Sequence, residues 1–423
     1  MLAVIAFVVA LGFGVVAPAI PLFARAYGVG TTAVGLAVSA FAFFRFASAF
    51  AGGSLVERLG ERLVLATGLG VVALGTGLAG LAGSFPVFLT LRAASGIGSA
   101  MFTVAALSLL LRSARPNERG RAAATYQGGF ILGGIAGPAA GGFLTEISPR
   151  LPFFLYAAFL LVAGAVALSL LRTGRGSRPA TAPAAAPARA GLGQAGLGPA
   201  GVDRSGVDQA GVDQAGVDQA GGTPSAAVPA TGQATGGLRA ALRTRSYRAA
   251  LVANLGVGWM IFGVRNSLVP LYVTEELGKT AAWAGAGLLA GSVAQAVGLL
   301  RSGRLSDTWG RRPALLLGAA LTTAATAVLA LPPHTAVFLL AMGTVGLGAS
   351  LLSSVPAAVV GDVSPHRSGR VVAVFSMVAD LGAVTGPLVA GWLTDTFSFQ
   401  VAFAVSAGVL GLGLLAALGM PRR

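Results

Sequence analysis

The chain has 423 residues, of which 55% are hydrophobic and 10% are charged, and its mean hydropathy is +0.80. About a quarter of the residues in a soluble globular domain are charged, so this composition excludes a soluble globule and indicates a protein embedded in a lipid bilayer. The net charge of +15 would suggest a nucleic-acid partner for a soluble protein, whereas in a membrane protein its distribution over the loops matters more. The chain has no cysteine, which excludes disulfides, thiol catalysis and thiolate metal sites.

Apolar stretches recur along the chain, and each has about 20 residues, enough for a helix to cross about 30 Å of hydrocarbon. The twelve stretches run from Leu2 to Phe23, Thr32 to Gly53, Leu63 to Ala82, Val87 to Leu111, Ala122 to Leu144, Pro152 to Leu171, Ala249 to Val273, Ala281 to Leu300, Pro313 to Leu331, Ala336 to Val360, Val371 to Leu393 and Phe399 to Met420. A membrane β-barrel would instead show alternating segments of about ten residues. The sequence therefore predicts an all-α membrane protein with twelve transmembrane helices.

The basic residues are distributed unevenly between the two sides of the membrane. Only Arg25, Arg150 and Lys279 fall on one side, and Arg45, Arg92 and Arg265 lie within spans; all other lysines and arginines fall on the side of the termini. The positive-inside rule then predicts a multi-pass protein of the cell membrane with both termini in the cytoplasm. All but one of the 29 basic residues are arginine, which is typical of a bacterial genome of high G+C content.

Residues 172–248 interrupt the apolar pattern and divide the chain. This segment is rich in alanine, glycine and proline, and it contains the low-complexity run GVDRSGVDQAGVDQAGVDQA. Such a composition cannot form a core, so we expect a disordered cytoplasmic linker between an N-terminal half, 1–171, and a C-terminal half, 249–423. Single carboxylates five residues apart lack the dense oxygen ligands of a calcium site, so no metal site is predicted.

The two halves repeat each other at an offset of 249 to 250 residues. Residues 53–62 read GSLVERLGER and residues 303–312 read GRLSDTWGRR, which is one pattern, G-x-L-x-(D/E)-x-x-G-x-R, in two corresponding loops. Gly137 with Pro138 corresponds in the same way to Gly386 with Pro387. Head-to-tail repeats in a membrane chain are typical of transporters, so the sequence predicts two pseudo-symmetric halves of six helices each.

The repeated loop resembles the signature of the major facilitator superfamily, which lies between spans 2 and 3 and again between spans 8 and 9. The residues that match are Gly53, Glu57, Arg58, Gly60, Arg62, Gly303, Asp307, Gly310, Arg311 and Arg312. Further patterns resemble the twelve-span drug:proton antiporter branch: Leu11-Gly12 with Pro18 and Pro21, Leu89 with Arg92, Gly96 and Gly98, and the fifth-span pattern of Gly133, Gly137, Pro138 and Gly141. The resemblance implies the major facilitator fold and transport by alternating access.

The repeated loops are expected to act as a cytoplasmic latch. In the family, span 2 faces span 11 and span 8 faces span 5, so Glu57 and Asp307 can approach the positive N-terminal ends of spans 11 and 5. These contacts would hold the cytoplasmic side shut. The alternative is that the loop arginines only satisfy the positive-inside rule.

Four ionisable residues fall within spans, and each costs about 2.5 to 3.5 kcal/mol at a helix centre, so each needs a partner or a wet cavity. Because spans 2 and 11 face each other in the family, we expect an ion pair between Arg45 and Asp380. Two interpretations stay open: Asp380 is the proton-coupling carboxylate, or the pair is a permanent structural bridge. Arg92 matches a family position linked to proton transfer, and its alternative is to snorkel to the outer interface.

Several other residues are candidates for the substrate cavity, although each taken singly is more typical of packing. Arg265 and Asn266 lie in span 7, which lines the central cavity of the family; the other candidates are Trp259, Asn254, Tyr126, Gln127 and Gln295. Glu146 and Asp395 occupy matched outer ends of spans 5 and 11, and we expect them to be solvent-exposed. Span 1 has no acid, unlike several members of the drug branch, which bears on proton coupling.

The leading hypothesis is a proton-coupled exporter of small amphipathic compounds, monomeric and without a cofactor, whose partners are its substrate, protons and the bilayer. A facilitator or importer of a sugar-like or organic solute is the alternative. A non-transporting membrane sensor is more remote, since the linker lacks aromatic anchors. No nucleophile–base pair, metal cluster or P-loop pattern appears, so neither an enzyme nor an ATP-driven pump is predicted.

Overall fold

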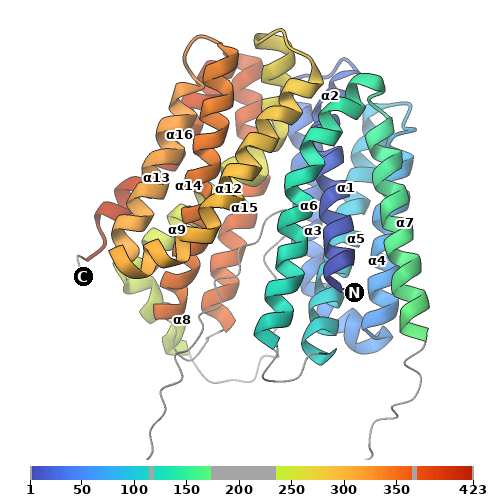
Figure 1. The fold of residues 1–423 in the computed structure, drawn as a ribbon, viewed down its shortest axis with the longest axis horizontal. Coiled ribbons are helices and arrows are strands. Elements are labelled where there is room, and N and C mark those ends of the chain that lie inside the picture. Colours follow the sequence, from blue (N-terminus) through green and yellow to red (C-terminus); the bar gives the residue numbers. More distant parts are fainter. Residues whose placement is uncertain (1, 114–118, 173–234, 364–368, 422–423) are drawn as a thin grey trace, which may run out of the picture.

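The computed structural model describes residues 2–113, 119–172, 235–363 and 369–421, and within these ranges the regular structure is helical (Figure 1). The N-terminal half comprises α1 (Leu2–Val16), α2 (Ala19–Arg25), α3 (Thr31–Leu59), α4 (Glu61–Ala79), α5 (Phe85–Ser113), α6 (Arg119–Ile147) and α7 (Leu151–Arg172). The C-terminal half comprises α8 (Thr235–Arg243), α9 (Arg245–Val257), η1 (Gly258–Val264), α10 (Arg265–Ser267), α11 (Val269–Leu271), η2 (Tyr272–Glu276), α12 (Ala281–Trp309), α13 (Arg311–Val328), α14 (Thr335–Val363), α15 (Gly369–Thr396) and α16 (Phe399–Leu418).

The twelve-helix membrane fold expected from the sequence is confirmed. Among the described residues, 11 helical segments are long and apolar enough to cross a membrane. The twelfth expected span corresponds to α13, which has 18 residues and opens with Arg311 and Arg312, so its mean hydropathy is lower. Span 1 is formed by α1 and α2 together, and span 7 runs from α9 to η2 and contains two π-helical segments, η1 and η2.

The helices extend beyond the apolar stretches that mark them in the sequence. For example, α3 and α12 each have 29 residues and end at Leu59 and Trp309, not near Gly53 and Leu300 as the hydropathy pattern predicts. An apolar stretch marks only the part of a helix inside hydrocarbon, and a helix of 29 residues is about 44 Å long. The chain turns at Gly60 and Gly310, whose φ angles of 81° and 93° favour glycine.

The boundary of the C-terminal half also differs from the prediction. Residues 235–248, expected to be part of the linker, form α8 and the start of α9, whereas residues 173–234 lie outside the described residues. Tyr247 is buried, and its hydroxyl donates a hydrogen bond to the Val371 carbonyl of α15 at 2.7 Å. The arginine-rich composition of this segment hid a short apolar face, so composition alone placed the boundary too late.

A close helix pair organises the N-terminal half, because α6 packs directly against the backbone of α1. A Cβ on any of four α6 glycines would lie within 2.5 Å of an α1 carbonyl oxygen, and the pairs are Gly129 with Ala3, Gly133 with Phe7, Gly137 with Leu11 and Gly141 with Val15. Both sets recur every fourth residue, so the two helices run side by side in register. The glycines of the fifth-span pattern therefore have α1 as their partner.

An aromatic cluster recurs at matched positions in the two halves. Phe23 packs against Phe88 and Phe153, with ring centroids 5.5 and 5.1 Å apart. In the C-terminal half, Tyr272 packs in the same way against Phe338 and Phe403, at 6.2 and 5.2 Å. The three pairs of positions are 249 or 250 residues apart, so the duplication seen in the loops extends into the core.

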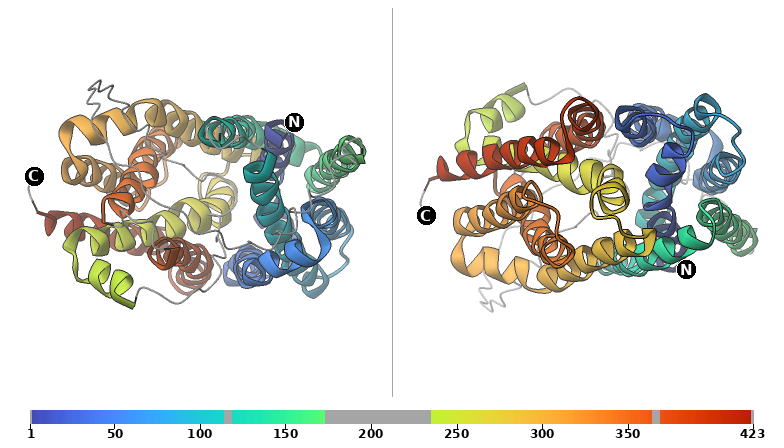
Figure 2. Two further views of the ribbon diagram at one scale, coloured as in Figure 1. Left: turned by 90° about the horizontal axis from the view of Figure 1, so that it is seen from below. Right: turned by 90° about the horizontal axis from the view of Figure 1, so that it is seen from above.

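The two halves stand beside each other and meet along two helix pairs, α3 with α15 and α6 with α12 (Figure 2). These are spans 2 with 11 and 5 with 8, the pairs expected from the family resemblance. Each pair joins one helix of the N-terminal half to one of the C-terminal half, so the contact surface between the halves follows the internal pseudo-symmetry.

Candidate transport site and the closure between the halves

A cavity lies between the halves, mostly on the side of the N-terminal half, with about 820 Å³ of empty space including the part open to solvent. Six aromatic residues dominate its wall: Phe13, Phe41, Phe102, Phe130, Tyr156 and Phe262. The polar groups in the wall are the side chains of Arg45, Arg92, Ser99, Thr103 and Asn266 and the hydroxyl of Tyr156. An apolar cavity with a few convergent polar groups is typical of a small-molecule site.

Arg45 and Asp380 are in contact across the two halves, as their positions in facing spans predicted. Nη2 of Arg45 lies 3.2 Å from Oδ1 of Asp380, and the two side chains are 13% and 17% exposed. Both residues lie near the middle of long helices, α3 and α15. Arg45 also lines the cavity, so the ion pair between the halves is part of the cavity wall.

Arg92 on α5 is buried in the cavity wall, with an exposed fraction of 3%. It therefore does not snorkel to the outer interface, the alternative that the sequence left open. Its Cζ lies 4.6 Å from the centroid of the Phe41 ring, a cation–π contact, and its buried Nε has no hydrogen-bond partner.

Arg265 and Gln295 form a second group of partly unpartnered polar side chains. The buried Nε and Nη1 of Arg265 and Oε1 of Gln295 have no hydrogen-bond partner. Nη1 of Arg265 lies beside Gly291 of α12, 3.6 Å from the position that a Cβ on this glycine would occupy. Gln295 is one helical turn further along the same helix. Asn266 donates to the Phe262 carbonyl of its own helix at 3.3 Å and lines the cavity.

Three of the other cavity candidates have packing partners in the structure. The Trp259 indole donates to the Ser406 hydroxyl at 3.1 Å, and the Asn254 amide donates to the Phe375 carbonyl at 2.7 Å, so each ties span 7 to a neighbouring helix. Tyr126 is buried and stacks edge-on against Phe130 at 5.2 Å. The side chain of Gln127 lies outside the described residues.

Asp307, Arg311 and Arg312 of the second repeated loop make contacts within the C-terminal half, not the cross-half contacts expected of a latch. Asp307 accepts from Nη1 of Arg311 at 2.6 Å, and Nε of Arg311 lies 3.1 Å from Asp362. Arg312 donates to the Leu418 carbonyl at 3.0 Å. Gly60 and Gly310 form the turns, and a Cβ at Gly303 would meet open space. Glu57, Arg58 and Arg62 are exposed, and Gly53 lies within α3.

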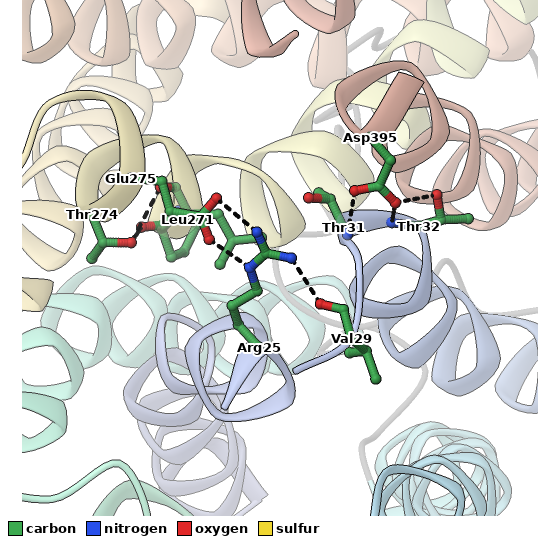
Figure 3. Close-up of polar contacts among 9 residues, drawn as sticks. Arg25, Val29, Thr31, Thr32, Leu271, Thr274, Glu275 and Asp395 are labelled. Atoms are coloured by element: carbon green, nitrogen blue, oxygen red, sulfur yellow. Dashed lines mark hydrogen bonds and ion pairs between the residues drawn. The ribbon is translucent and has the colours of Figure 1, made fainter. Parts of the chain in front are cut away.

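The halves instead close at the opposite end of the molecule, which we call the outer end because the expected orientation places it outside the cell. At this end, Asp395 at the end of α15 accepts hydrogen bonds from the backbone N–H groups of Thr31 and Thr32, both at 2.7 Å (Figure 3). The Thr32 hydroxyl adds a third bond at 2.6 Å. A carboxylate from one half thus caps the first turn of α3 in the other.

Glu146 makes the matching contact between the other pair of helices. Its Oε1 accepts from the N–H of Ala282, in the first turn of α12, at 3.0 Å. Gly142 and Gly285 allow this approach, because a Cβ on either would lie 2.9 Å from the Cα of the other. Glu146 and Asp395 are exposed, as the sequence predicted, but each also has a specific partner in the other half. Each is the partner of a helix N-terminus that is remote in sequence.

An ion pair completes the outer closure, the set of contacts made by Arg25, Glu275, Asp395 and Glu146. Nε and Nη2 of Arg25 lie 2.8 and 3.3 Å from the two carboxylate oxygens of Glu275 (Figure 3). Nη1 of Arg25 donates to the Val29 carbonyl at 2.8 Å, which fixes the guanidinium between the halves. In this structure, the two halves are therefore joined from the outer end down to the level of Arg45 and Asp380.

A family profile described as Major Facilitator Superfamily matches residues 2–291 and again residues 250–423. The chain belongs to the Major Facilitator Superfamily, and it is a multi-pass membrane transporter built on a fold of non-enzymatic carriers.

Curated relatives include drug-resistance transporters. The chain is 28% identical over 169 residues to the quinolone resistance protein NorA of Staphylococcus aureus, which covers 39% of this chain and 42% of that protein. It is 31% identical over 170 residues to multidrug resistance protein 1 of Bacillus subtilis, covering 39% and 43%. The chain thus matches less than half the length of these relatives.

Among solved structures, the fold is similar to that of a bacterial homologue of the human lysosomal transporter Spinster. The structure of that protein in an inward-facing, unoccupied conformation matches with a TM-score of 0.74 at 16% identity, covering 99% of this chain and 95% of the other. Its inward-facing, occupied structure matches with a TM-score of 0.70 at 14% identity. At this identity the similarity establishes the fold alone.

Proposed function

We propose that the chain is a proton-coupled exporter of small amphipathic compounds that works by alternating access. The observation that carries the proposal is the Arg45–Asp380 ion pair, because it joins the two halves and also forms part of the cavity wall. A group in this position can respond both to a proton and to a bound solute. The names of the drug-resistance relatives support the efflux direction.

Protonation of Asp380 is the step that couples the proton to the movement of the halves. The pair holds α3 against α15 while the carboxylate is charged, and a neutral carboxyl removes the charge attraction to Arg45. A ligand shifts an equilibrium between two states only by the difference in its binding energy for them. An arginine in contact with Asp380 favours the charged carboxylate, so proton binding favours the state in which Arg45 and Asp380 separate.

The two ends of the molecule supply the two gates of this cycle. The outer closure stabilises the state with the cavity closed to the outside. In the opposite state the outer closure opens, and the repeated loops with Glu57 and Asp307 meet the N-terminal ends of α15 and α6. Inward proton movement is worth about 2.3 kcal/mol per charge per 100 mV, which sustains about a fifty-fold gradient of a neutral solute.

The test is proton movement in proteoliposomes after addition of cationic, neutral and anionic drugs and of simple sugars. We expect drug-induced proton release in the parent and none in Asp380→Asn. Asp362→Asn, which removes an acid on α14 outside the cavity, is the matched control and should keep coupling. Unchanged coupling in Asp380→Asn would leave the ion pair as a structural bridge. Passive exchange of sugars without proton movement would favour the facilitator.

A further inference from the structure

The interior of the described spans has an excess of positive charge. Within the twelve apolar stretches, the described residues include Arg45, Arg92 and Arg265, but only one acid, Asp380. Asp380 is committed to Arg45 at 3.2 Å, so two arginines remain without a carboxylate. Uncompensated charge inside a membrane is costly, and such residues typically mark the path of a substrate or an ion.

The hydrogen-bonding state of these two arginines is consistent with a missing anionic partner. Arg92 is 3% exposed, lies in the cavity wall and has an unpartnered Nε. Its contact with the Phe41 ring offers partial compensation, but a ring face accepts no charge-assisted hydrogen bond in the guanidinium plane. Arg265, next to the cavity residue Asn266, has two unpartnered nitrogens.

The remainder of the cavity wall indicates what the anion is attached to. Six aromatic side chains surround the space, whereas the uncharged polar groups are few: Ser99, Thr103, Asn266 and the hydroxyl of Tyr156. Aromatic rings stack on flat apolar bodies, and this contact between rings stabilises the complex beyond the burial of apolar surface alone. A sugar would need many more hydrogen-bonding groups than this wall offers.

We propose that the substrates of this transporter are aromatic anions, with the ring system held among the phenylalanines and the acidic group bound by Arg92. This inference rests on the proposed function and narrows its substrate class. A carboxylate or sulfonate bound at Arg92 supplies the acceptor that its Nε lacks, and it neutralises part of the positive excess. Planar guanidinium groups match such anions with two parallel hydrogen bonds.

The experiment compares three probes that share one ring system and differ in charge: naphthalene-2-sulfonate, the neutral naphthalene-2-sulfonamide and the naphthalen-2-yl-trimethylammonium cation. Binding to the full chain in phosphatidylcholine nanodiscs is measured by equilibrium dialysis. We expect the sulfonate to bind most tightly. Arg92→Gln should weaken sulfonate binding about tenfold or more and weaken sulfonamide binding much less, because only the sulfonate loses an ion pair with the guanidinium.

Two further variants separate a binding role from a structural one. Arg92→Lys keeps the charge and should recover part of the sulfonate affinity, whereas Arg150→Gln, on an exposed loop at the outer end, should leave it unchanged. Tighter binding of the cation, or equal loss of all three probes in Arg92→Gln, would overturn the anion inference while drug-induced proton release keeps the proposed function. No binding of any probe together with no proton release would overturn both.

Discussion

The two halves of this transporter share their packing but not their interior charges. The aromatic clusters around Phe23 and Tyr272 correspond, and Glu146 and Asp395 cap helices in matching positions. In contrast, the position that matches Arg92 is Met342, 250 residues later. The duplication has therefore kept the framework that lets the halves move symmetrically, while the chemistry of the site is present only once.

The same pattern holds for the central ion pair. Arg45 corresponds to Gln295, and Asp380 corresponds to Ile131, so the second copy of this site is uncharged. A duplicated pair would place two ion pairs between the halves and would tighten the state that must open. A single pair makes the contact between the halves dependent on one carboxyl group, which is what the proposed coupling to one proton requires.

Spans 1 and 7 differ in backbone regularity as well. The α1 helix packs on α6 through four evenly spaced glycines, whereas the matching C-terminal span is interrupted by the π-helices η1 and η2. Of the four glycines on α6, two have glycine counterparts on α15, Gly382 and Gly386. π-Helical turns are common at functional sites, and η1 directly precedes Arg265 and Asn266. The irregular span thus presents the cavity residues of the C-terminal half.

The largest effect is expected where the shared packing is closest. Gly137→Val should prevent stable folding, because the first added atom would lie 2.5 Å from the Leu11 carbonyl oxygen. Overpacking of this kind costs about 1 to 3 kcal/mol and more where backbone blocks the movement. The yield of monodisperse protein and its melting temperature measure the loss.

Gly134→Val is the matched control on the same helix, since a Cβ there meets nothing within 4 Å. Gly386→Val tests the corresponding position in the other half, where the Cβ would lie 2.8 Å from the Trp259 carbonyl oxygen. If Gly137→Val failed to fold while Gly386→Val folded well, the two helix pairs would not be equivalent.

The next effect concerns the two caps of the outer closure. Asp395→Asn with Glu146→Gln should open the outer end, because each carboxylate at a helix N-terminus contributes about 0.3 to 1 kcal/mol, up to about 2 when partly buried. The double change is expected to shift the equilibrium between the states by about thirty-fold. The natural chain has no cysteine, so spin labels at Ser148→Cys and Lys279→Cys report the distance across the closure.

The two caps are not equal, which sharpens the comparison of the halves. Asp395 accepts three hydrogen bonds, whereas Glu146 accepts from the Ala282 N–H and the Thr280 side chain, so Asp395→Asn alone should shift the labels more than Glu146→Gln alone. Glu276→Gln, a nearby acid that contacts Gln400 at 3.4 Å, is the control. A larger response to Glu146→Gln would show that hydrogen-bond number does not rank the caps.

A smaller effect is expected at the repeated loops. Glu57→Ala and Asp307→Ala should each reduce transport about two- to fivefold, because each removes an acid from a helix N-terminus in the proposed opposite state. Membrane insertion should be intact, as judged by expression and elution volume. Thr308→Ala, whose hydroxyl bonds the Arg304 carbonyl of its own helix, is the control. Normal transport by both acidic variants would contradict a latch at this end.

The smallest effect is expected at two matched ion pairs, one in each half. Where one half has the acid, the other half has the arginine. Arg112 contacts Glu61 in one half, and Arg311 contacts Asp362 at the matched positions in the other. Exchanging the charges by Glu61→Arg with Arg112→Glu should be nearly neutral, because surface pairs contribute about 0 to 1 kcal/mol. Glu61→Arg alone should lower the melting temperature slightly. Equal stability of both variants would show that this pair contributes nothing.

Much of the fold could be predicted because the bilayer imposes strong rules. Hydropathy marked all twelve spans, and the repeat with its family resemblance paired span 2 with span 11. The need to compensate buried charge then placed Arg45 beside Asp380. These predictions follow from constraints that act on single residues or on whole spans.

The features that the sequence did not predict depend on partners that are remote in the chain. Glu146 looked like an ordinary exposed acid, since nothing local shows that Ala282 presents an unpaired N–H to it. Trp259 and Asn254 were assigned to the cavity by their span, yet the face they occupy meets Ser406 and Phe375. One signal was available for the acids: their matched positions suggested a common role.

The uncompensated arginines of the interior have an electrical consequence. If an aromatic monoanion leaves the cell as one proton enters, both movements carry positive charge inward, and two charges cross the membrane in each cycle. Each charge is worth about 2.3 kcal/mol per 100 mV, so membrane voltage alone could drive export without any difference in pH. A cavity built for anions would then make the transporter an electrogenic device, whose current reverses when the voltage across the vesicle is reversed.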